Sequence, residues 1–322
     1  MQLWINRTLR LSILLVFVLA LAACGQSPAS QSAAPQTSPA PAAPAATDAK
    51  ITVEDAQGTV TLPKKPERIV TMDFSFTDML VTLGVQPVGI ADDGTPDLFM
   101  DSVKSQLKTY TSVGSRYEPN IELISSLKPD LIIVDINKHK NALTQLKSVA
   151  PILVLNDFQA DYEQMLKNYI ITAKAVGKEA EGQKRLKEHE AKMEQAKQKI
   201  KNAKLTVLPA VVNPKGFFGH SDHSYSGSMV HMLGFTDPLK NNAAYPQLTL
   251  EQLVETNPQA LFLMPTEKTT IVNEWEKNPL WNKIDAVANK KVFTVERRDW
   301  SLSRGMLGSE KIAEDIVKQL GE

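Results

Sequence analysis

The sequence contains one helix-and-strand pattern twice, once in each half. The first copy is NIELISSLKPDLIIV at residues 120–134, and the second is TLEQLVETNPQALFL at residues 249–263. Each copy begins with a residue favoured at a helix N-cap, places a Glu in the first helical turn, and has a Pro seven positions after that Glu. Each ends in an apolar run typical of a buried strand. This duplication favours a molecule built from two related lobes.

Around each copy, strand and helix patterns alternate. In the first half, a helical run between two β-type runs stops at Leu83-Gly84. In the second half, a β-type run at 205–212 precedes a helical run that stops at Leu233-Gly234. Such alternation predicts parallel sheets covered by helices. We therefore expect an α/β protein of two similar parallel-sheet lobes with a ligand cleft between them, because ligand sites favour lobe interfaces and the carboxyl ends of parallel strands.

A different kind of segment separates the two halves. The helical pattern breaks near Gly177, and residues 178–202 then form a highly charged run without Pro. A helix of this composition lies mostly in solvent, so it either bridges two lobes or returns along the surface of the same sheet. We predict a single bridging α-helix at 178–202, which leaves an N-terminal lobe at 51–177 and a C-terminal lobe at 203–322.

The first residues of the chain have no core pattern. Arg7 and Arg10 precede an uncharged apolar run that ends in LAAC at Cys24, which resembles a bacterial lipobox. Residues 1–23 are therefore predicted to be a lipoprotein signal peptide, with a plain signal peptide as the alternative. Pro, Ala and Ser dominate residues 24–50, which predicts a disordered tether. The mature protein is then extracytoplasmic and anchored to the cell membrane by acyl chains on Cys24.

Composition narrows the classes of function. The 36 basic and 36 acidic residues argue against general nucleic-acid binding, for which a basic stripe is usual. Cys24 is the only cysteine, so the sequence excludes an intramolecular disulfide and a cysteine metal site. The sequence has no Gly-x-Ser-x-Gly elbow, no phosphate-binding Walker loop and no convincing pair of general acid and base. We therefore predict a protein without catalytic activity.

Several motifs together resemble one family. They are PERIV at 66–70, VGSRYEPNIELISSLKPDLII at 113–133, the second copy of the repeated pattern, and KKVFTVERRDW at 290–300. With the lipobox and the tether, they resemble the class III substrate-binding lipoproteins of ATP-driven importers for iron–siderophore complexes, haem and cobalamin. The resemblance covers residues 51–322 and is sharpest in the Gly-x-x-x-x-Pro-Asn-x-Glu element at 114–122. It implies two α/β lobes joined by one long helix, with little closure on binding, and we expect a monomer.

The C-terminal segment RRDWSLSRG most resembles binders of ferric citrate and related carboxylate siderophores. The resemblance implies a solute-binding component that passes a ferric chelate to a permease of two transmembrane subunits, driven by a cytoplasmic ATPase. No intrinsic cofactor is expected, because the ligand itself is the ferric iron–chelator complex. The alternative ligands are a hydroxamate or catecholate siderophore, haem or cobalamin. Two other functions stay open, which are an extracytoplasmic enzyme and a direct binder of zinc or manganese.

Glu122 and Glu251 are predicted to contact the permease. An acidic residue in the first turn of a helix contributes roughly 0.3–1 kcal/mol, which explains why a Glu is tolerated at each position. That effect does not explain why both copies carry it. In the resembled family, a Glu at each place lies on the outer rim of its lobe and pairs with permease arginines. The resemblance therefore implies two anchors, one for each permease subunit.

Arginines are the predicted ligand contacts. An iron–carboxylate complex is anionic, and its chelator already fills most of the coordination shell of the metal. The protein therefore needs donors to carboxylate oxygens, and Arg grips two oxygens at once better than Lys does. Arg116 lies in a loop after a strand, where the family has a ligand-binding Arg. Arg297, Arg298 and Arg304 follow a strand end that is expected to face the cleft, and we favour Arg304 and Arg297 over Arg298.

Histidine and aromatic residues complete the predicted site. His220 and His223 form a His-x-x-His motif, but no further ligands stand at metal-site spacing, so we predict no metal held directly by the protein. His220 is instead expected to be a hydrogen-bond donor or a cation beside the anionic ligand. Tyr225, Phe217 and Trp300 are expected to wall the cleft, with packing under a loop as an equal alternative for Phe217.

Overall fold

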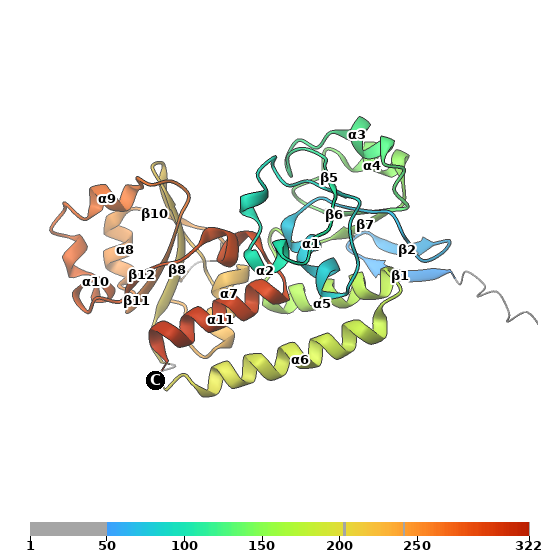
Figure 1. Ribbon diagram of the computed structural model, residues 1–322. Coiled ribbons are helices and arrows are strands. Elements are labelled where there is room, and N and C mark those ends of the chain that lie inside the picture. Colours follow the sequence, from blue (N-terminus) through green and yellow to red (C-terminus); the bar gives the residue numbers. More distant parts are fainter. Residues whose placement is uncertain (1–49, 202–203, 241, 322) are drawn as a thin grey trace, which may run out of the picture. The chain divides into compact units, whose positions relative to one another are not determined.

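The computed structural model describes residues 50–201, 204–240 and 242–321 (Figure 1). The predicted signal peptide, the predicted lipidation site at Cys24 and nearly all of the predicted tether lie outside the described residues. Within the described ranges, no helix combines the length and the apolar character needed to cross a membrane.

The first sheet has five parallel strands in the spatial order β5-β4-β3-β6-β7. Strands β3, β6 and β7 are buried throughout, as expected for parallel strands covered on both faces. The strands are β3 (Ile69–Thr71), β4 (Gly89–Ile90), β5 (Thr111–Ser112), β6 (Leu131–Asp135) and β7 (Ile152–Leu155). The helices of this lobe are α1 (Phe74–Thr82), α2 (Asp101–Lys104), α3 (Ile121–Ser126), α4 (Leu143–Val149) and α5 (Tyr162–Ala175), with a 3-10 turn at Pro96–Leu98.

An antiparallel hairpin precedes this sheet and was not predicted from the sequence. Its strands are β1 (Ile51–Asp55) and β2 (Gly58–Leu62). The backbone N–H of Ala56 donates to the carbonyl of Val154 at 2.9 Å, and the N–H of Val154 donates to Oδ2 of Asp55 at 2.8 Å. Val154 belongs to β7, so the hairpin lies against the outer edge of the first sheet.

The second sheet repeats the strand order of the first, as β10-β9-β8-β11-β12, but it is mixed. Strand β11 pairs in parallel with β8 and β12, whereas β9 pairs antiparallel with β8 and β10. The sequence pattern predicts a parallel sheet, but the tight turn at Asn213-Pro214-Lys215-Gly216 reverses the chain and makes β8 and β9 antiparallel neighbours. In that turn the side chain of Asn213 accepts a hydrogen bond from the N–H of Lys215 at 2.8 Å. The strands are β8 (Val207–Asn213), β9 (Gly216–Gly219), β10 (Gln247–Leu248), β11 (Ala260–Pro265) and β12 (Val292–Thr294).

The helices of the C-terminal lobe complete the repeated arrangement. They are α7 (Tyr225–Met232), α8 (Leu250–Thr256), α9 (Ile271–Trp275), α10 (Asp285–Ala288) and α11 (Met306–Leu320), with a 3-10 turn at Trp281–Lys283 and a π-helical turn at Arg298–Leu302. The two copies of the sequence pattern form α3 with β6 and α8 with β11. Asn120 caps α3 by accepting from the N–H of Leu123, and Thr249 forms a capping box with Gln252 at the start of α8. The predicted helix starts are confirmed.

The long charged helix is α6 (Glu179–Gln198), which follows a turn at Gly177 with φ of +63°. It packs against α5 of the N-terminal lobe and against α11 of the C-terminal lobe (Figure 1). At Gly182 a Cβ atom would lie only 2.5 Å from Cβ of Ala173, so glycine permits the close approach of α6 to α5.

One apolar cluster is shared by both sheets. It takes Ile133 from β6 and Phe262 from β11, together with Tyr169 from α5. The neighbouring residues Ile132 and Leu261 point to the opposite faces and belong to clusters confined to one lobe each. A wide opening of the lobes would have to expose part of the shared cluster to water, at about 25 cal/mol for each Å² of apolar surface.

Candidate functional site

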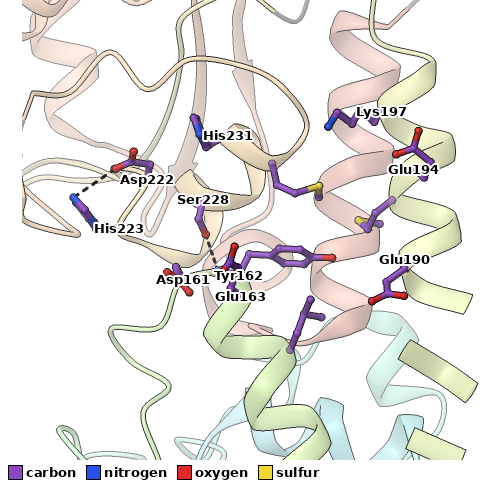
Figure 2. Close-up of a pocket in the computed structure, with 13 residues that line it drawn as sticks. Asp161, Tyr162, Glu163, Glu190, Glu194, Lys197, Asp222, His223, Ser228 and His231 are labelled. Carbon is purple, nitrogen blue, oxygen red and sulfur yellow. Dashed lines mark hydrogen bonds and ion pairs between the residues drawn. The ribbon is translucent and has the colours of Figure 1, made fainter. Parts of the chain in front are cut away.

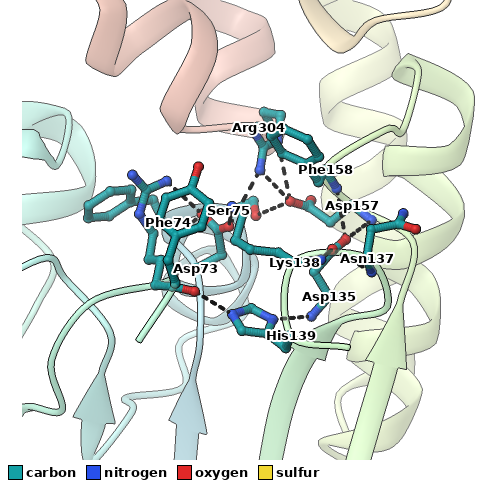
Figure 3. Close-up of polar contacts among 12 residues, drawn as sticks. Asp73, Phe74, Ser75, Asp135, Asn137, Lys138, His139, Asp157, Phe158 and Arg304 are labelled. Atoms are coloured by element: carbon teal, nitrogen blue, oxygen red, sulfur yellow. Dashed lines mark hydrogen bonds and ion pairs between the residues drawn. The ribbon is translucent and has the colours of Figure 1, made fainter. Parts of the chain in front are cut away.

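Three strands of the N-terminal lobe lead into buried aspartates. Asp73 follows β3 and caps α1, Asp135 ends β6, and Asp157 follows β7. All three are 0 % exposed. Because β3, β6 and β7 are parallel neighbours, their carboxyl ends meet at one edge of the sheet, and the carboxylates gather there (Figure 3).

Asp73 is the centre of a buried ion network. Its Oδ2 pairs with Nζ of Lys138 and lies 3.5 Å from Nη2 of Arg304, while its Oδ1 lies 3.4 Å from Nη1 of Arg116. Burial acts to raise the pKa of Asp73, but the charges of Lys138, Arg304 and Arg116 outweigh burial and hold that pKa well below its usual range. Asp73 therefore stays ionised at ordinary pH.

Asp157 joins the two lobes through Arg304. Its Oδ2 accepts hydrogen bonds from Nη2 of Arg304 at 2.7 Å, from Nε of the same side chain at 3.3 Å, and from Oγ of Ser75 at 2.8 Å. Its Oδ1 is buried without a hydrogen-bond partner. Burial raises the pKa of Asp157, and the charge of Arg304 offsets this effect only in part.

Arg116 is fixed by its own loop and by the neighbouring one. Its backbone N–H, Nε and Nη2 donate to Asp93 at 2.8, 3.0 and 2.7 Å, and its guanidinium carbon lies 4.4 Å from the ring centroid of Phe74. His139 accepts a hydrogen bond from the N–H of Asp135 on Nδ1, so its Nε2 carries a proton, which it donates to the carbonyl of Arg116 at 2.9 Å. Burial lowers the pKa of His139, which favours this neutral ring.

Arg297 differs from these cations. Among the described residues, it has neither an ion pair nor a hydrogen bond from Nε. Its side chain is partly buried, and burial, followed by the charge of Arg116, lowers its pKa; Arg304 acts in the same direction. The charge of Asp93 acts in the opposite direction without forming an ion pair. A partly buried guanidinium without an ion-pair partner is unfavourable, and an anion beside it would relieve that cost.

Tyr117 adds an aromatic surface next to the cations. Its ring centroid lies 5.4 Å from Nζ of Lys138 and 5.8 Å from the guanidinium carbon of Arg116. The residue is 60 % exposed, in contrast to the partly buried Phe158, whose ring centroid lies 5.2 Å from Nζ of Lys138 and 5.7 Å from the guanidinium carbon of Arg304. The exposed ring gives the site an apolar wall that a ligand can cover.

Ion pairs connect most of the charged side chains at this place, which we call the basic cluster. The basic cluster consists of Arg116, Lys138, Arg297 and Arg304 with Asp73, Asp93 and Asp157. Asp135 lies at the same strand edge and accepts hydrogen bonds from backbone N–H groups, so 4 − 4 leaves no net charge when all eight groups are ionised. Within this balance Arg297 forms no ion pair among the described residues, and an anion beside it is therefore favoured.

A separate cavity has the opposite character. It measures about 570 Å³ and lies where α5, α6 and α7 meet (Figure 2). Its lining includes one lysine, Lys197, and five carboxylates, which are Asp161, Glu163, Glu190, Glu194 and Asp222. An anionic ligand would be repelled there, so the cavity and the basic cluster do not compete for the same ligand.

A family model described as periplasmic binding protein matches residues 69–298, which is more than half of the chain. The chain belongs to this family. The predicted family is thereby confirmed.

Two relatives support the same assignment. This chain is 40 % identical over 269 residues to the Fe(3+)-citrate-binding protein YfmC of Bacillus subtilis, and the match covers 83 % of this chain and 85 % of YfmC. It is 36 % identical over 269 residues to the Fe(3+) dicitrate-binding periplasmic protein FecB of Escherichia coli, covering 83 % of this chain and 89 % of FecB.

A solved structure gives the same result for the fold. Staphylococcus aureus SirA, complexed with staphyloferrin B, matches this periplasmic binding protein with a TM-score of 0.74 at 27 % identity, covering 84 % of this chain and 98 % of SirA. The likeness confirms the predicted two-lobed α/β fold class.

The structure of the binding protein brings three of the four predicted arginines together. Arg116, Arg297 and Arg304 belong to the basic cluster. Arg298 instead pairs with Asp101 of the N-terminal lobe through Nη1–Oδ1 and Nη2–Oδ2 contacts of 3.1 Å each. This pairing does not fit the predicted ligand contact of Arg298, and it agrees with the preference for Arg304 and Arg297.

The three predicted aromatic wall residues are buried. Trp300 is 0 % exposed and stacks on Phe262 with 4.7 Å between ring centroids. Phe217 is 0 % exposed, and Tyr225 is 1 % exposed with its hydroxyl donating to the carbonyl of Gly305 at 2.8 Å. The burial of Phe217 agrees with the packing alternative, and the burial of Tyr225 and Trp300 does not fit the predicted wall role.

His220 lies near the basic cluster as a neutral side chain. Its Nδ1 is 2.5 Å from Oγ of Ser226, and its ring meets that of Tyr245 edge to face at 4.8 Å. Burial, followed by the charges of Arg304 and Arg297, lowers its pKa to about 3. This favours a neutral His220 in the unliganded protein, and its predicted role beside an anionic ligand, as hydrogen-bond donor or as cation, stays a prediction.

His223 does not join His220 in a metal site. Its side chain is 55 % exposed and its Nε2 lies 3.7 Å from Oδ1 of Asp222. Across the parts of the chain that the structure describes, no group of three or more His, Cys, Asp or Glu residues is arranged to hold a metal ion.

The predicted permease contacts occupy equivalent places in the two lobes. Glu122 lies in the first turn of α3 and Glu251 in the first turn of α8, and both are exposed. Their contact with a permease stays a prediction.

Sequence patterns did not identify the partners of the arginines. The available signal was an acidic residue at or just after each apolar run, in TMD, IIVD and LND. Lys138 gave no signal, because the segment NKHK resembles any solvated loop, yet its side chain is only 1 % exposed. For Tyr117 the available signal was its position directly after Arg116.

Proposed function

We propose that this chain is a non-catalytic, extracytoplasmic solute-binding component of an ABC importer. Its proposed cargo is a ferric siderophore, with ferric citrate or another carboxylate chelate favoured. The observation that carries the proposal is Arg297, whose guanidinium is partly buried and forms no ion pair among the described residues. The charges of Arg116 and Arg304 repel it, and the charge of Asp93 attracts it without an ion pair. An anionic chelate would supply the missing charge, and it needs no metal ligands from the protein.

The ligand class follows from the shape of the donors and from the relatives. A planar guanidinium matches the two oxygens of a carboxylate better than it matches a neutral hydroxamate complex. The relatives named for Fe(3+)-citrate and Fe(3+) dicitrate binding support the same class. A catecholate complex, which is also anionic, is the alternative that the charge of the basic cluster allows.

We also propose how the cargo is delivered. Glu122 and Glu251 each contact one transmembrane subunit of the permease, whose ATPase lies in the cytoplasm, and a monomer suffices because both contacts belong to one chain. Exposure of both carboxylates at equivalent helix starts supports this arrangement. A lipid on Cys24 would keep the protein at the membrane.

Adjacent arginines provide a matched test of the ligand site. Ferric citrate is expected to quench the tryptophan fluorescence of the purified protein saturably. Arg297→Gln should weaken this binding about tenfold, because loss of a charged hydrogen-bond partner costs roughly 1.5–3 kcal/mol. Arg298→Gln should leave it unchanged, because Arg298 already pairs with Asp101. Equal effects of the two substitutions, or saturation by a hydroxamate complex in place of ferric citrate, would contradict the proposal.

A further inference from the structure

Resting on this proposed function, we propose that Asp157 competes with a ligand carboxylate for Arg304, so that binding exchanges one carboxylate for another. In the unliganded protein Asp157 occupies part of the guanidinium; in the complex the ligand takes its place. Asp157 thereby sets how tightly the site holds an anionic chelate.

The pairing of Arg304 with Asp157 is incomplete. Nε and Nη2 of Arg304 both donate to Oδ2, at 3.3 and 2.7 Å, while Oδ1 of Asp157 has no hydrogen-bond partner. A guanidinium binds a carboxylate best when each N–H faces a different oxygen. A mobile ligand carboxylate can adopt that arrangement, whereas Asp157 does not. The protein's own pair is therefore weaker than the pair that would replace it.

Asp157 remains supported after such an exchange. Oγ of Ser75 still donates to its Oδ2 at 2.8 Å, and its backbone N–H donates to Oδ2 of Asp135 at 2.8 Å. The position of residue 157 therefore does not depend on Arg304. Burial also raises the pKa of Asp157, so uptake of a proton can neutralise the carboxylate once the arginine has left.

The other carboxylates of the basic cluster are held more firmly. Asp73 faces three cations and accepts a capping bond from Phe74, so removal of one cation leaves it paired. Both oxygens of Asp93 accept hydrogen bonds. Its Oδ1 accepts from the backbone N–H of Arg116, and its Oδ2 accepts from the guanidinium of Arg116. Of the paired arginines, Arg304 is thus the one that a ligand can recruit with the smallest loss.

The test compares dissociation constants for ferric citrate, measured by tryptophan quenching. Asp157→Asn keeps the shape and removes the charge that competes for Arg304, so it should bind about tenfold more tightly. Asp101→Asn is the matched control, because it removes one carboxylate from Arg298 outside the basic cluster and should leave the affinity unchanged. Unchanged or weaker binding by Asp157→Asn would overturn the exchange, as would equal tightening by both variants.

A pH profile separates competition from a structural effect. The groups that act on Asp157 are Arg304, Asp73, Lys138, Ser75 and Tyr245. As pH falls through the raised pKa of Asp157, the wild-type side chain becomes neutral like Asn. The ratio of wild-type to Asp157→Asn dissociation constants should therefore fall toward one, and taking the ratio cancels the ionisation of citrate itself. A ratio that does not change with pH would contradict the exchange.

A second variant covers the case in which Asp157→Asn does not fold. Ser75→Ala removes a donor to the ionised carboxylate, so the pH below which ferric citrate binding tightens should be higher in Ser75→Ala than in the wild type. Comparison of these two proteins needs no Asp157→Asn variant, and identical pH dependences would contradict the proposal. If the wild-type protein binds no ferric citrate, the proposed function fails and the exchange fails with it. If it does bind and Asp157→Asn is no tighter, only the exchange fails.

Discussion

The two lobes share one strand order but carry different groups at equivalent strand ends. In the first sheet, β3, β6 and β7 lead into Asp73, Asp135 and Asp157. In the second sheet, the equivalent strands β8, β11 and β12 end at Asn213, Pro265 and Thr294, and the loop after β12 supplies Arg297 and Arg304. Duplicated folds can thus diverge into complementary halves, in which the carboxylates of one lobe hold an arginine of the other.

At the helix starts the two lobes have stayed alike. Glu122 and Glu251 occupy the first turns of α3 and α8, before the equivalent strands β6 and β11. A glutamate at the same place in both lobes fits a partner that has two similar subunits. The different groups at the strand ends fit a single ligand that contacts both lobes.

Removal of the shared feature has the largest expected effect. Cells that carry Glu122→Gln with Glu251→Gln should lose uptake of radioactive ferric citrate almost completely, while the purified double variant binds ferric citrate as the wild type does. Glu118→Gln with Glu255→Gln is the control, because these exposed residues lie near the same helices. Normal uptake by the first variant, or loss of ligand binding, would show that the two glutamates have another role.

Removal of the central carboxylate should have the next largest effect, on stability. Asp73→Asn leaves the buried cations Lys138 and Arg304 without their shared counter-charge, so the free energy of unfolding in urea should fall by roughly 3–5 kcal/mol. Asp93→Asn should cost less, because the side chain of Asp93 is 21 % exposed and water can replace part of its interactions. Equal losses would mean that Asp73 is not the centre of the network.

Asp78 is a contrasting carboxylate on the same helix as Ser75. It is 0 % exposed, its oxygens have no hydrogen bond of normal geometry, and a Cβ atom at Gly305 would lie 2.3 Å from its carboxyl carbon. Burial raises the pKa of Asp78 to about 7, and the N–H groups of Leu307 and Gly308 offset this only in part. Asp73 forms ion pairs with three cations, whereas Asp78 forms none among the described residues.

The smallest predicted effect is a pH dependence of stability from Asp78. The folded state keeps its proton up to about pH 7, whereas the unfolded chain releases it near the ordinary value of 3.8. The resulting stabilisation is complete at low pH and is lost as pH rises, by about 1.4 kcal/mol per unit between these limits. The free energy of unfolding in urea should therefore be lower at pH 8 than at pH 5 in the wild type, and this decrease should be absent in Asp78→Asn. The same slope in both proteins would exclude Asp78 as its source.

The local part of the fold could be predicted from the sequence. Asn120 and Thr249 identify helix starts because capping depends on residues three positions apart, and the apolar runs of β6 and β11 identify buried strands. The turn at Asn213-Pro214-Lys215-Gly216 was also readable, since its residues are common in turns, and it explains why the second sheet is mixed.

The candidate site was only partly predictable. Arg297 and Arg304 could be placed because loops after parallel strands face ligand sites. Their ion pairs could not be predicted, because Arg304 pairs with a carboxylate 147 positions away and Arg297 forms no ion pair among the described residues. Nor does sequence distinguish the buried Trp300 from the exposed Tyr117, since each is an aromatic residue within two positions of an arginine.

The hairpin of β1 and β2 has a consequence for how copies of the molecule meet. Strand β7 forms one edge of the first sheet, and open edges are templates onto which strands of other molecules add. Ala56 and Asp55 occupy the outward N–H and carbonyl of Val154 at that edge. The opposite edge, β5, is only two residues long. The first sheet therefore offers no long open strand on which aggregation between neighbouring chains could begin.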